Sequence, residues 1–200
     1  MQQTDWYYIV LDHLPHPPDH LVEKIDKVYR PAQPLFKQDD KNYLRVDTVT
    51  DWKNQEYNWI KPMASNPNVR HRFTSEYENW VRENIIDEFD DYNSGIMFFD
   101  TEQLPHTDTT RKYVLLYNVE TGGNTTLSFW QEEGHPVFRD PGLAVNRGPH
   151  LKLIKSVNGP AKCWYLLDTR VIHSVENMSG LRVNFQVSFS KFPEKLIGNP

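Results

Sequence analysis

The sequence predicts a mainly β protein with flanking helices (α+β), in which a β sandwich or barrel occupies residues 94–190. Two observations predict this fold class. After Ser94, eight short runs rich in β-branched and aromatic residues follow one another, divided by Gly, Pro and Asn. Ahead of them, two segments repeat apolar residues at three- and four-residue steps, which is the spacing of one face of a helix.

The length of 200 residues corresponds to a single domain with one sizeable core. Within it we expect residues 1–93 to form a helical and irregular supporting region, residues 94–190 the β core and residues 191–200 a tail. Aromatic residues make up 13% of the chain, which is enough to fill this core and to line a pocket.

Charge and composition narrow the expected partners and location. The formal net charge is −5 and Lys and Arg form no long run, so nucleic-acid binding has no electrostatic support. The N-terminus shows no charged leader followed by an apolar stretch, and no run of about 18 apolar residues occurs, so we expect no membrane partner. Cys163 is the only cysteine, which rules out a disulfide within the chain and agrees with a cytoplasmic location.

The first predicted helix spans residues 18–30. Leu21, Ile25 and Val28 recur along one of its faces. Pro31 ends it, because proline has no amide hydrogen to donate and its ring clashes with the preceding turn.

The second predicted helix spans residues 74–90. Its apolar face repeats more strongly than that of the first and consists of Tyr77, Trp80, Val81, Ile85 and Phe89. Residues 31–73, between the two helices, are rich in polar residues and prolines, and one strand is expected there at 43–49.

The β half follows as short runs with clear turn signals. The predicted strands are 95–99, 112–119, 124–130, 135–138, 151–157, 161–167, 170–175 and 181–190. The best turn signals are 121–124 (TGGN) and 158–160 (NGP), because Gly and Asn tolerate the positive φ that tight hairpin turns need.

Two histidines and one carboxylate form the candidate metal site. His106 and Asp108 are two residues apart, so in an extended segment both side chains point to the same face. His173 follows on a distant predicted strand and supplies a third ligand. Two imidazoles and one carboxylate make the facial triad suited to Fe(II) that must also bind a co-substrate and dioxygen.

Arg182 is the candidate anchor for a carboxylate ligand. It lies nine residues after His173, and a turn at 177–180 would return it on the strand next to that histidine. Its planar guanidinium forms a fork that matches a carboxylate. Asn184 would share the inward face of Arg182 and line the pocket, while Arg111 either contacts a carboxylate of a substrate or co-substrate or lies exposed in a turn.

Residues 95–190 resemble the core of the 2-oxoglutarate- and Fe(II)-dependent dioxygenases, especially the prolyl-4-hydroxylase-like branch. The resemblance rests on the segments 105–108 (PHTD), 118–126 (NVETGGNTT), 159–161 (GPA), 173–175 (HSV) and 180–182 (GLR). It implies a double-stranded β-helix core of the jelly-roll or cupin-like type.

The resemblance also implies roles for individual residues. His106, Asp108 and His173 would ligate iron, and Arg182 would bind the far carboxylate of the co-substrate 2-oxoglutarate. That branch usually carries Lys in place of Arg182, whereas other branches of the superfamily use Arg. The implied reaction consumes dioxygen and 2-oxoglutarate, releases succinate and CO2, and hydroxylates an unactivated C–H bond of a peptidyl or small-molecule substrate, with ascorbate as a supporting reductant.

Three more side chains fall on strands that line the cavity in this family. Tyr117, Thr126 and Trp164 are therefore candidates for contact with the co-substrate, with plain core packing as the alternative. The remaining histidines lack a paired ligand at a useful spacing and are interpreted as structural or surface residues; they are His13, His16, His20, His71, His135 and His150.

Two other functions stay open from the sequence. A cupin-like enzyme could use Zn, Mn or Fe without 2-oxoglutarate, but it would have no need of a buried carboxylate clamp such as Arg182. A non-enzymatic β-sandwich binding module would leave the three ligand groups scattered. Separations above about 6 Å between them would favour the binding module, because metal bonds of about 2 Å bring donor atoms close together.

Overall fold

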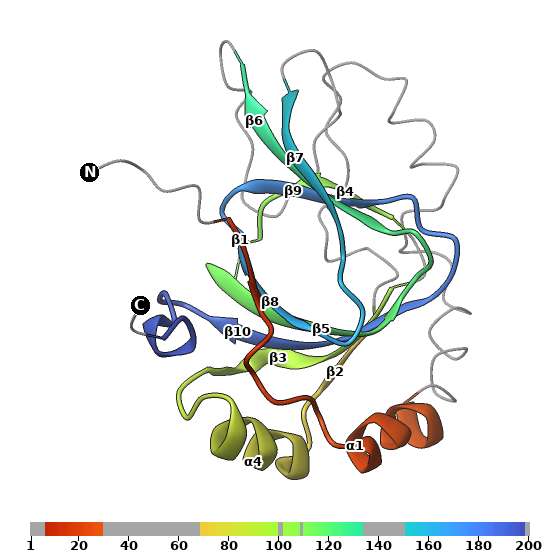
Figure 1. Ribbon diagram of the computed structural model, residues 1–200, viewed down its shortest axis with the longest axis vertical. Coiled ribbons are helices and arrows are strands. Elements are labelled where there is room, and N and C mark those ends of the chain that lie inside the picture. The colour runs from red at the N-terminus through yellow and green to blue at the C-terminus, as the bar shows by residue number, and fades with distance from the viewer. Residues whose placement is uncertain (1–6, 30–68, 100–101, 109, 134–150, 199–200) are drawn as a thin grey trace.

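A computed structural model describes residues 7–29, 69–99, 102–108, 110–133 and 151–198 of the chain. These residues form two β-sheets, with helices against one of them (Figure 1). The strands are β1 (Tyr8–Leu11), β2 (Val69–Arg72), β3 (Asp90–Phe99), β4 (Gln103–His106), β5 (Tyr113–Thr121), β6 (Thr126–Glu132), β7 (Leu151–Asn158), β8 (Trp164–Asp168), β9 (Ile172–Glu176) and β10 (Arg182–Phe189).

The two sheets differ in size. The large sheet has the strand order β1-β8-β5-β10-β3-β2, and the small sheet has the order β4-β9-β6-β7. All of these neighbours pair antiparallel. From β3 to β10 the chain passes repeatedly between the sheets, since β3, β5, β8 and β10 lie in the large sheet and the other four in the small one. The predicted mainly β fold with flanking helices is confirmed.

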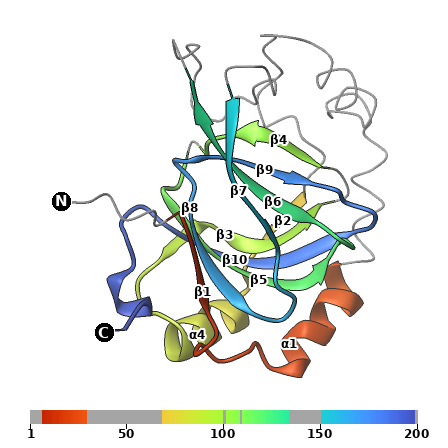
Figure 2. The ribbon, with the colours of Figure 1, turned by 45° about the horizontal axis from the view of Figure 1, so that its top comes forward.

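The helices cover the face of the large sheet that points away from the small sheet (Figure 2). They are α1 (Asp19–Lys24), which continues as a π-helical turn η1 (Ile25–Tyr29), and α4 (Ser75–Asn84). Leu21 of α1 and Tyr77 of α4 are buried, and the Tyr77 hydroxyl donates a hydrogen bond of 2.7 Å to the Leu21 carbonyl. The two helices are thus held to each other as well as to the sheet.

Strand β10 shows how the large sheet separates its two faces, because successive side chains of a strand point to opposite sides. One set is apolar and packs in the core beneath the helices: Val183, Phe185, Val187 and Phe189. The other set is polar, equally buried, and lies on the face toward the small sheet: Arg182, Asn184, Gln186 and Ser188. A buried polar face of this kind needs partners, because each unpaired polar group costs free energy.

A second apolar core lies between the large sheet and the small sheet. Its buried residues come from both sheets and are Val114, Leu116, Leu127, Phe129, Tyr165, Leu167 and Val175. Burial of these side chains is the main force that holds the sheets face to face.

Several element boundaries differ from those predicted. The second helix ends at Asn84 and β3 begins at Asp90, although the apolar repeat predicted a helix to residue 90 and a strand only from residue 95. The reason is non-local, since Asp90 pairs with Ser188 of β10. Strands β1, β2 and β4 were not predicted, because segments of four residues carry too little periodicity. The strands predicted at 43–49 and 135–138 lie outside the described residues.

The C-terminal segment is more than the expected tail. Its 3-10 turn η5 (Glu194–Leu196) buries Leu196, which is 2% exposed, among the residues beneath the helices. The Leu196 carbonyl also lies 3.1 Å from Nε2 of His13. The structure therefore corrects the predicted tail of residues 191–200 for the part that it describes, which ends at residue 198.

Among the helices of the described residues, none combines the length and apolarity that crossing a membrane requires.

Candidate metal centre

His106 and His173 meet because two strands of the small sheet pair at these residues. His106 ends β4, His173 lies on β9, and the two stand directly opposite each other in the antiparallel ladder. Opposed residues have closely spaced Cβ atoms, which brings the imidazoles together at a centroid distance of 4.4 Å. Sheet pairing thus joins two residues that are far apart in the sequence.

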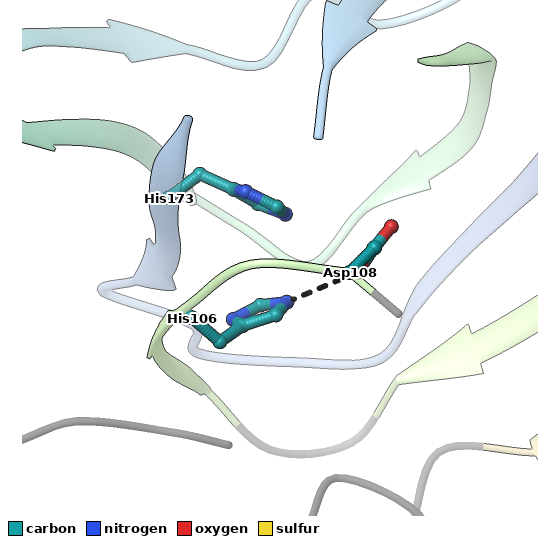
Figure 3. A group of neighbouring side chains, drawn as sticks. All are labelled: His106, Asp108 and His173. Atoms are coloured by element: carbon teal, nitrogen blue, oxygen red, sulfur yellow. Dashed lines mark ion pairs between the residues drawn. The ribbon is translucent and has the colours of Figure 1, made fainter. Parts of the chain in front are cut away.

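Asp108 completes the group from the segment that leaves β4 (Figure 3). Its backbone N–H donates a hydrogen bond of 3.1 Å to the Thr169 carbonyl, which fixes the chain beside β9. One ligand atom from each of Asp108, His106 and His173 can be chosen so that all lie within 4.8 Å of one another. The predicted convergence is confirmed, and this group can bind a metal ion. Scattered ligand groups, as expected for a binding module, are not observed.

The His173 ring is oriented by its own strand. Its Nδ1 lies 2.8 Å from the Val171 carbonyl, which accepts only if Nδ1 carries the hydrogen. We therefore assign the Nδ1–H tautomer, in which the Nε2 lone pair is free for a metal. Burial, together with the nearby His106, lowers the pKa of His173 to about 4, so the ring is neutral at pH 7.

The Asp108 carboxylate is shared between two neighbours. Its Oδ1 lies 3.6 Å from Nε2 of His106, and its Oδ2 accepts a hydrogen bond of 2.5 Å from Nε of Arg111. Burial alone would raise the pKa of Asp108, but the Arg111 guanidinium and the nearby rings of His106 and His173 outweigh it and hold this pKa well below its usual range. The donor set is therefore two imidazoles and one carboxylate that is ionised at neutral pH.

The lowered pKa of His173 gives an expected pH dependence of stability for the metal-free protein. Between pH 6.5 and about 4 the unfolded chain binds a proton at His173 that the folded chain does not, so stability falls as pH falls through this window. The loss amounts to at most about 3.5 kcal/mol, at roughly 1.4 kcal/mol for each pKa unit. Melting temperatures of the metal-free protein between pH 4 and 8, at constant ionic strength, measure it.

The matched variant for this measurement is His173→Gln, which cannot titrate. Its melting temperature should fall less steeply from pH 6.5 to 4 than that of the wild type. Equal slopes for the two proteins would show that His173 keeps an ordinary pKa in the folded state.

Arg182 is a buried cation on the polar face of β10. It is 4% exposed, its Nη2 donates a hydrogen bond of 3.0 Å to the Tyr165 hydroxyl, and its guanidinium lies 5.2 Å from the centre of the Phe99 ring. Within the described part of the chain no carboxylate pairs with it. A buried charge without a counter-ion is costly, so this position is suited to an anionic ligand.

Asn184 lies two residues further on the same face and has an unused donor. The residue is fully buried, and its Oδ1 accepts a hydrogen bond of 3.0 Å from Nε2 of Gln186. Its Nδ2 has no acceptor among the described residues. The placement of Asn184 on the inward face of Arg182 agrees with the prediction from strand alternation.

The other three predicted co-substrate contacts are not brought to this site. Tyr117 and Trp164 point to the opposite face of the large sheet, where the Tyr117 hydroxyl lies 3.1 Å from Nδ1 of His16 and Trp164 Nε1 donates to the Pro15 carbonyl at 2.8 Å. Thr126 lies at the start of β6, where its Oγ1 accepts a hydrogen bond from Asn177. The structure corrects the prediction for all three, because both faces of these strands are partly or fully buried and residue type alone does not tell them apart.

Sequence reasoning missed two side chains of the site. Tyr165 neighbours Trp164 on β8 but points inward, where its hydroxyl accepts from Arg182 and donates to Asn118 Oδ1 at 3.1 Å. Gln186 continues the inward row of β10. Alternation from Arg182 would have indicated Gln186, whereas Tyr165 required knowledge of which face of β8 the helices cover.

Comparison with known proteins adds no family assignment. No protein-family model, no curated protein and no solved structure matches the chain. The chemistry of the candidate metal centre and of the buried Arg182 therefore carries the functional proposal.

Proposed function

We propose that this protein is a 2-oxoglutarate- and Fe(II)-dependent dioxygenase that hydroxylates an unactivated C–H bond of a peptidyl or small-molecule substrate and releases succinate and CO2. One observation carries the proposal. A group of two histidines and one aspartate lies in the space between two sheets that also buries Arg182, a cation without a carboxylate partner in the described residues.

The order of the strands supports a double-stranded β-helix core. In that fold eight antiparallel strands wind between two facing sheets of four. Here the runs β8-β5-β10-β3 and β4-β9-β6-β7 supply such a pair, with β1 and β2 added at the edges of the large sheet. The likeness of this order, together with the segments around His106 and His173, favours the dioxygenase superfamily.

The donor set fits Fe(II). His106, His173 and Asp108 offer two nitrogen ligands and one hard oxygen ligand, and three protein ligands leave positions on the metal for other molecules. Bound iron would supply the activation of dioxygen that oxidation of an unactivated C–H bond requires. The chain itself supplies a neutral, oriented His173 and an ionised Asp108, so neither of these two ligands has to lose a proton at pH 7.

The buried polar face of β10 fits a dicarboxylate co-substrate. Arg182 would hold its far carboxylate through the fork of the guanidinium, with the Tyr165 hydroxyl beside it. The unused Nδ2 donor of Asn184 would serve a further oxygen of the same molecule. Phe129, which is fully buried and stands opposite His173 in the β6–β9 ladder, helps to exclude water from the reacting groups.

The same observations separate this proposal from the alternatives. A cupin-like metal enzyme without 2-oxoglutarate gives no reason for Arg182 to be buried without a counter-ion. A non-enzymatic β-sandwich gives no reason for three ligand groups to approach within 4.8 Å.

A turnover assay tests the proposal. Purified protein with Fe(II), ascorbate, dioxygen and 2-oxoglutarate is incubated with a panel of free amino acids, prolyl peptides and nucleobases, and succinate is measured. We expect succinate to form only when Fe(II) is present and to increase with one class of the panel. A wild-type protein that neither forms succinate nor binds 2-oxoglutarate in calorimetry with Mn(II) would refute the proposed co-substrate.

A further inference from the structure

A chain of hydrogen bonds leads from the metal-binding carboxylate across to the large sheet. Arg111 donates from Nε to Oδ2 of Asp108 at 2.5 Å and from Nη1 to Oε1 of Gln186 at 2.5 Å. Gln186 then donates from Nε2 to Oδ1 of Asn184 at 3.0 Å. The chain ends at the Nδ2 of Asn184, which has no acceptor among the described residues.

The direction of every bond in this chain follows from one residue. A guanidinium only donates hydrogen bonds, so Gln186 must turn its oxygen toward Arg111. Its NH2 group then faces Asn184, which must present its own oxygen in return. The NH2 group of Asn184 is therefore the donor that stays without an acceptor among the described residues. An amide by itself has no preference for either orientation.

We infer that Arg111 and Gln186 are positioning residues that fix Asn184 as a hydrogen-bond donor, so that the site selects a ligand with a carbonyl or carboxylate oxygen at this point. The identity of that ligand as 2-oxoglutarate rests on the proposed function. Arg111 also donates a hydrogen bond to Oδ2 of Asp108. One guanidinium therefore aligns both the Asp108 carboxylate and, through Gln186, the Nδ2 donor of Asn184. The side chain of Arg111 is only 17% exposed, which suits a fixed structural bridge rather than a surface charge.

The first variant, Gln186→Glu, exchanges one NH2 group for an oxygen at a residue that is not the proposed ligand contact. The carboxylate that this variant introduces keeps one oxygen for Arg111 but turns its second oxygen toward Asn184. The Asn184 amide must then rotate so that its Nδ2 donates to this second oxygen. After the rotation, Oδ1 of Asn184 stands where Nδ2 stood before and faces the ligand. Because this oxygen repels a carboxylate, the Kd for 2-oxoglutarate should rise at least about tenfold.

The second variant, Asn184→Asp, places an acceptor at the same point directly. It should weaken 2-oxoglutarate binding at least about tenfold as well, since the ligand loses a donor and gains a like charge. The control is Gln131→Glu, which makes the same amide-to-acid exchange at an exposed position of β6 and should leave the Kd unchanged.

Isothermal calorimetry of 2-oxoglutarate at saturating Mn(II) measures each Kd without turnover, so a weakened metal site does not enter the comparison. Losses in both Gln186→Glu and Asn184→Asp with an unchanged control support the inference. A Gln186→Glu protein with the wild-type Kd overturns it, whatever Asn184→Asp does, because Gln186 then does not set the amide. If the wild type itself fails to bind 2-oxoglutarate, the proposed function fails instead.

Discussion

The Asp108→Ala variant is expected to lose Fe(II)-dependent succinate formation altogether. Asp108 is the one carboxylate of the ligand group, and the substitution leaves only the two histidines to hold a divalent cation. It also leaves the Arg111 guanidinium, now without its carboxylate partner, facing that cation. We expect the affinity for Mn(II) or Fe(II) to fall by more than about 100-fold, since loss of even an outer partner of a metal ligand typically costs about 10–100-fold.

Calorimetry with Mn(II) and the succinate assay measure the two effects of Asp108→Ala separately. The matched control is Asp91→Ala, which removes a carboxylate from a surface ion pair with Arg82. Its metal affinity and turnover should equal those of the wild type, because exposed pairs of this kind contribute little. Normal turnover by Asp108→Ala would disprove the assignment of the metal ligands.

The Arg182→Met variant is expected to lose 2-oxoglutarate binding while it keeps its metal. Removing one partner of a buried, hydrogen-bonded ion pair costs about 3–5 kcal/mol, which corresponds to a Kd raised by at least about 100-fold. The hydrogen bond of Arg182 goes to Tyr165, which is not one of the metal ligands, so the Kd for Mn(II) should stay within about threefold of the wild-type value. Calorimetry with each ligand measures both.

The same substitution should raise the melting temperature of the protein without ligands. Arg182 is buried against Tyr165 and Phe99 without a carboxylate among the described residues, so an unbranched apolar side chain of similar length removes a desolvation cost. Arg82→Met, at a surface ion pair, is the control and should change little. An Arg182→Met protein that binds 2-oxoglutarate normally would exclude the carboxylate clamp.

Residue patterns predicted that His106 and Asp108 act together because the relevant geometry is local. The side chains of His106 and Asp108 are two apart, and this spacing by itself places both on one side of an extended segment. Alternation likewise placed Asn184 on the face of Arg182. The pairing of His106 with His173 is not local, and only the type of residue suggested it.

Other parts of the site depended on how the sheets and helices pack. Trp164 and Tyr165 are adjacent, aromatic and buried, yet one contacts the helices and the other contacts Arg182. For Arg111 the sequence left open a contact with a carboxylate of a substrate or co-substrate and an exposed place in a turn, but in the structure Arg111 bridges the Asp108 carboxylate and the large sheet. Neither the contact between Tyr165 and Arg182 nor the bridging role of Arg111 can be predicted from the spacing of residues in the sequence.

The sequence by itself determined most strands of the β half, the ligand types and the fact that Arg182 and Asn184 share one face of β10. Only the tertiary structure decided which side of the large sheet the helices occupy, and therefore that Tyr117 and Trp164 are excluded from the site while Tyr165 belongs to it. The physical reason is that alternation fixes which residues share a face, whereas the identity of the covering layer is set by long-range packing of apolar surface.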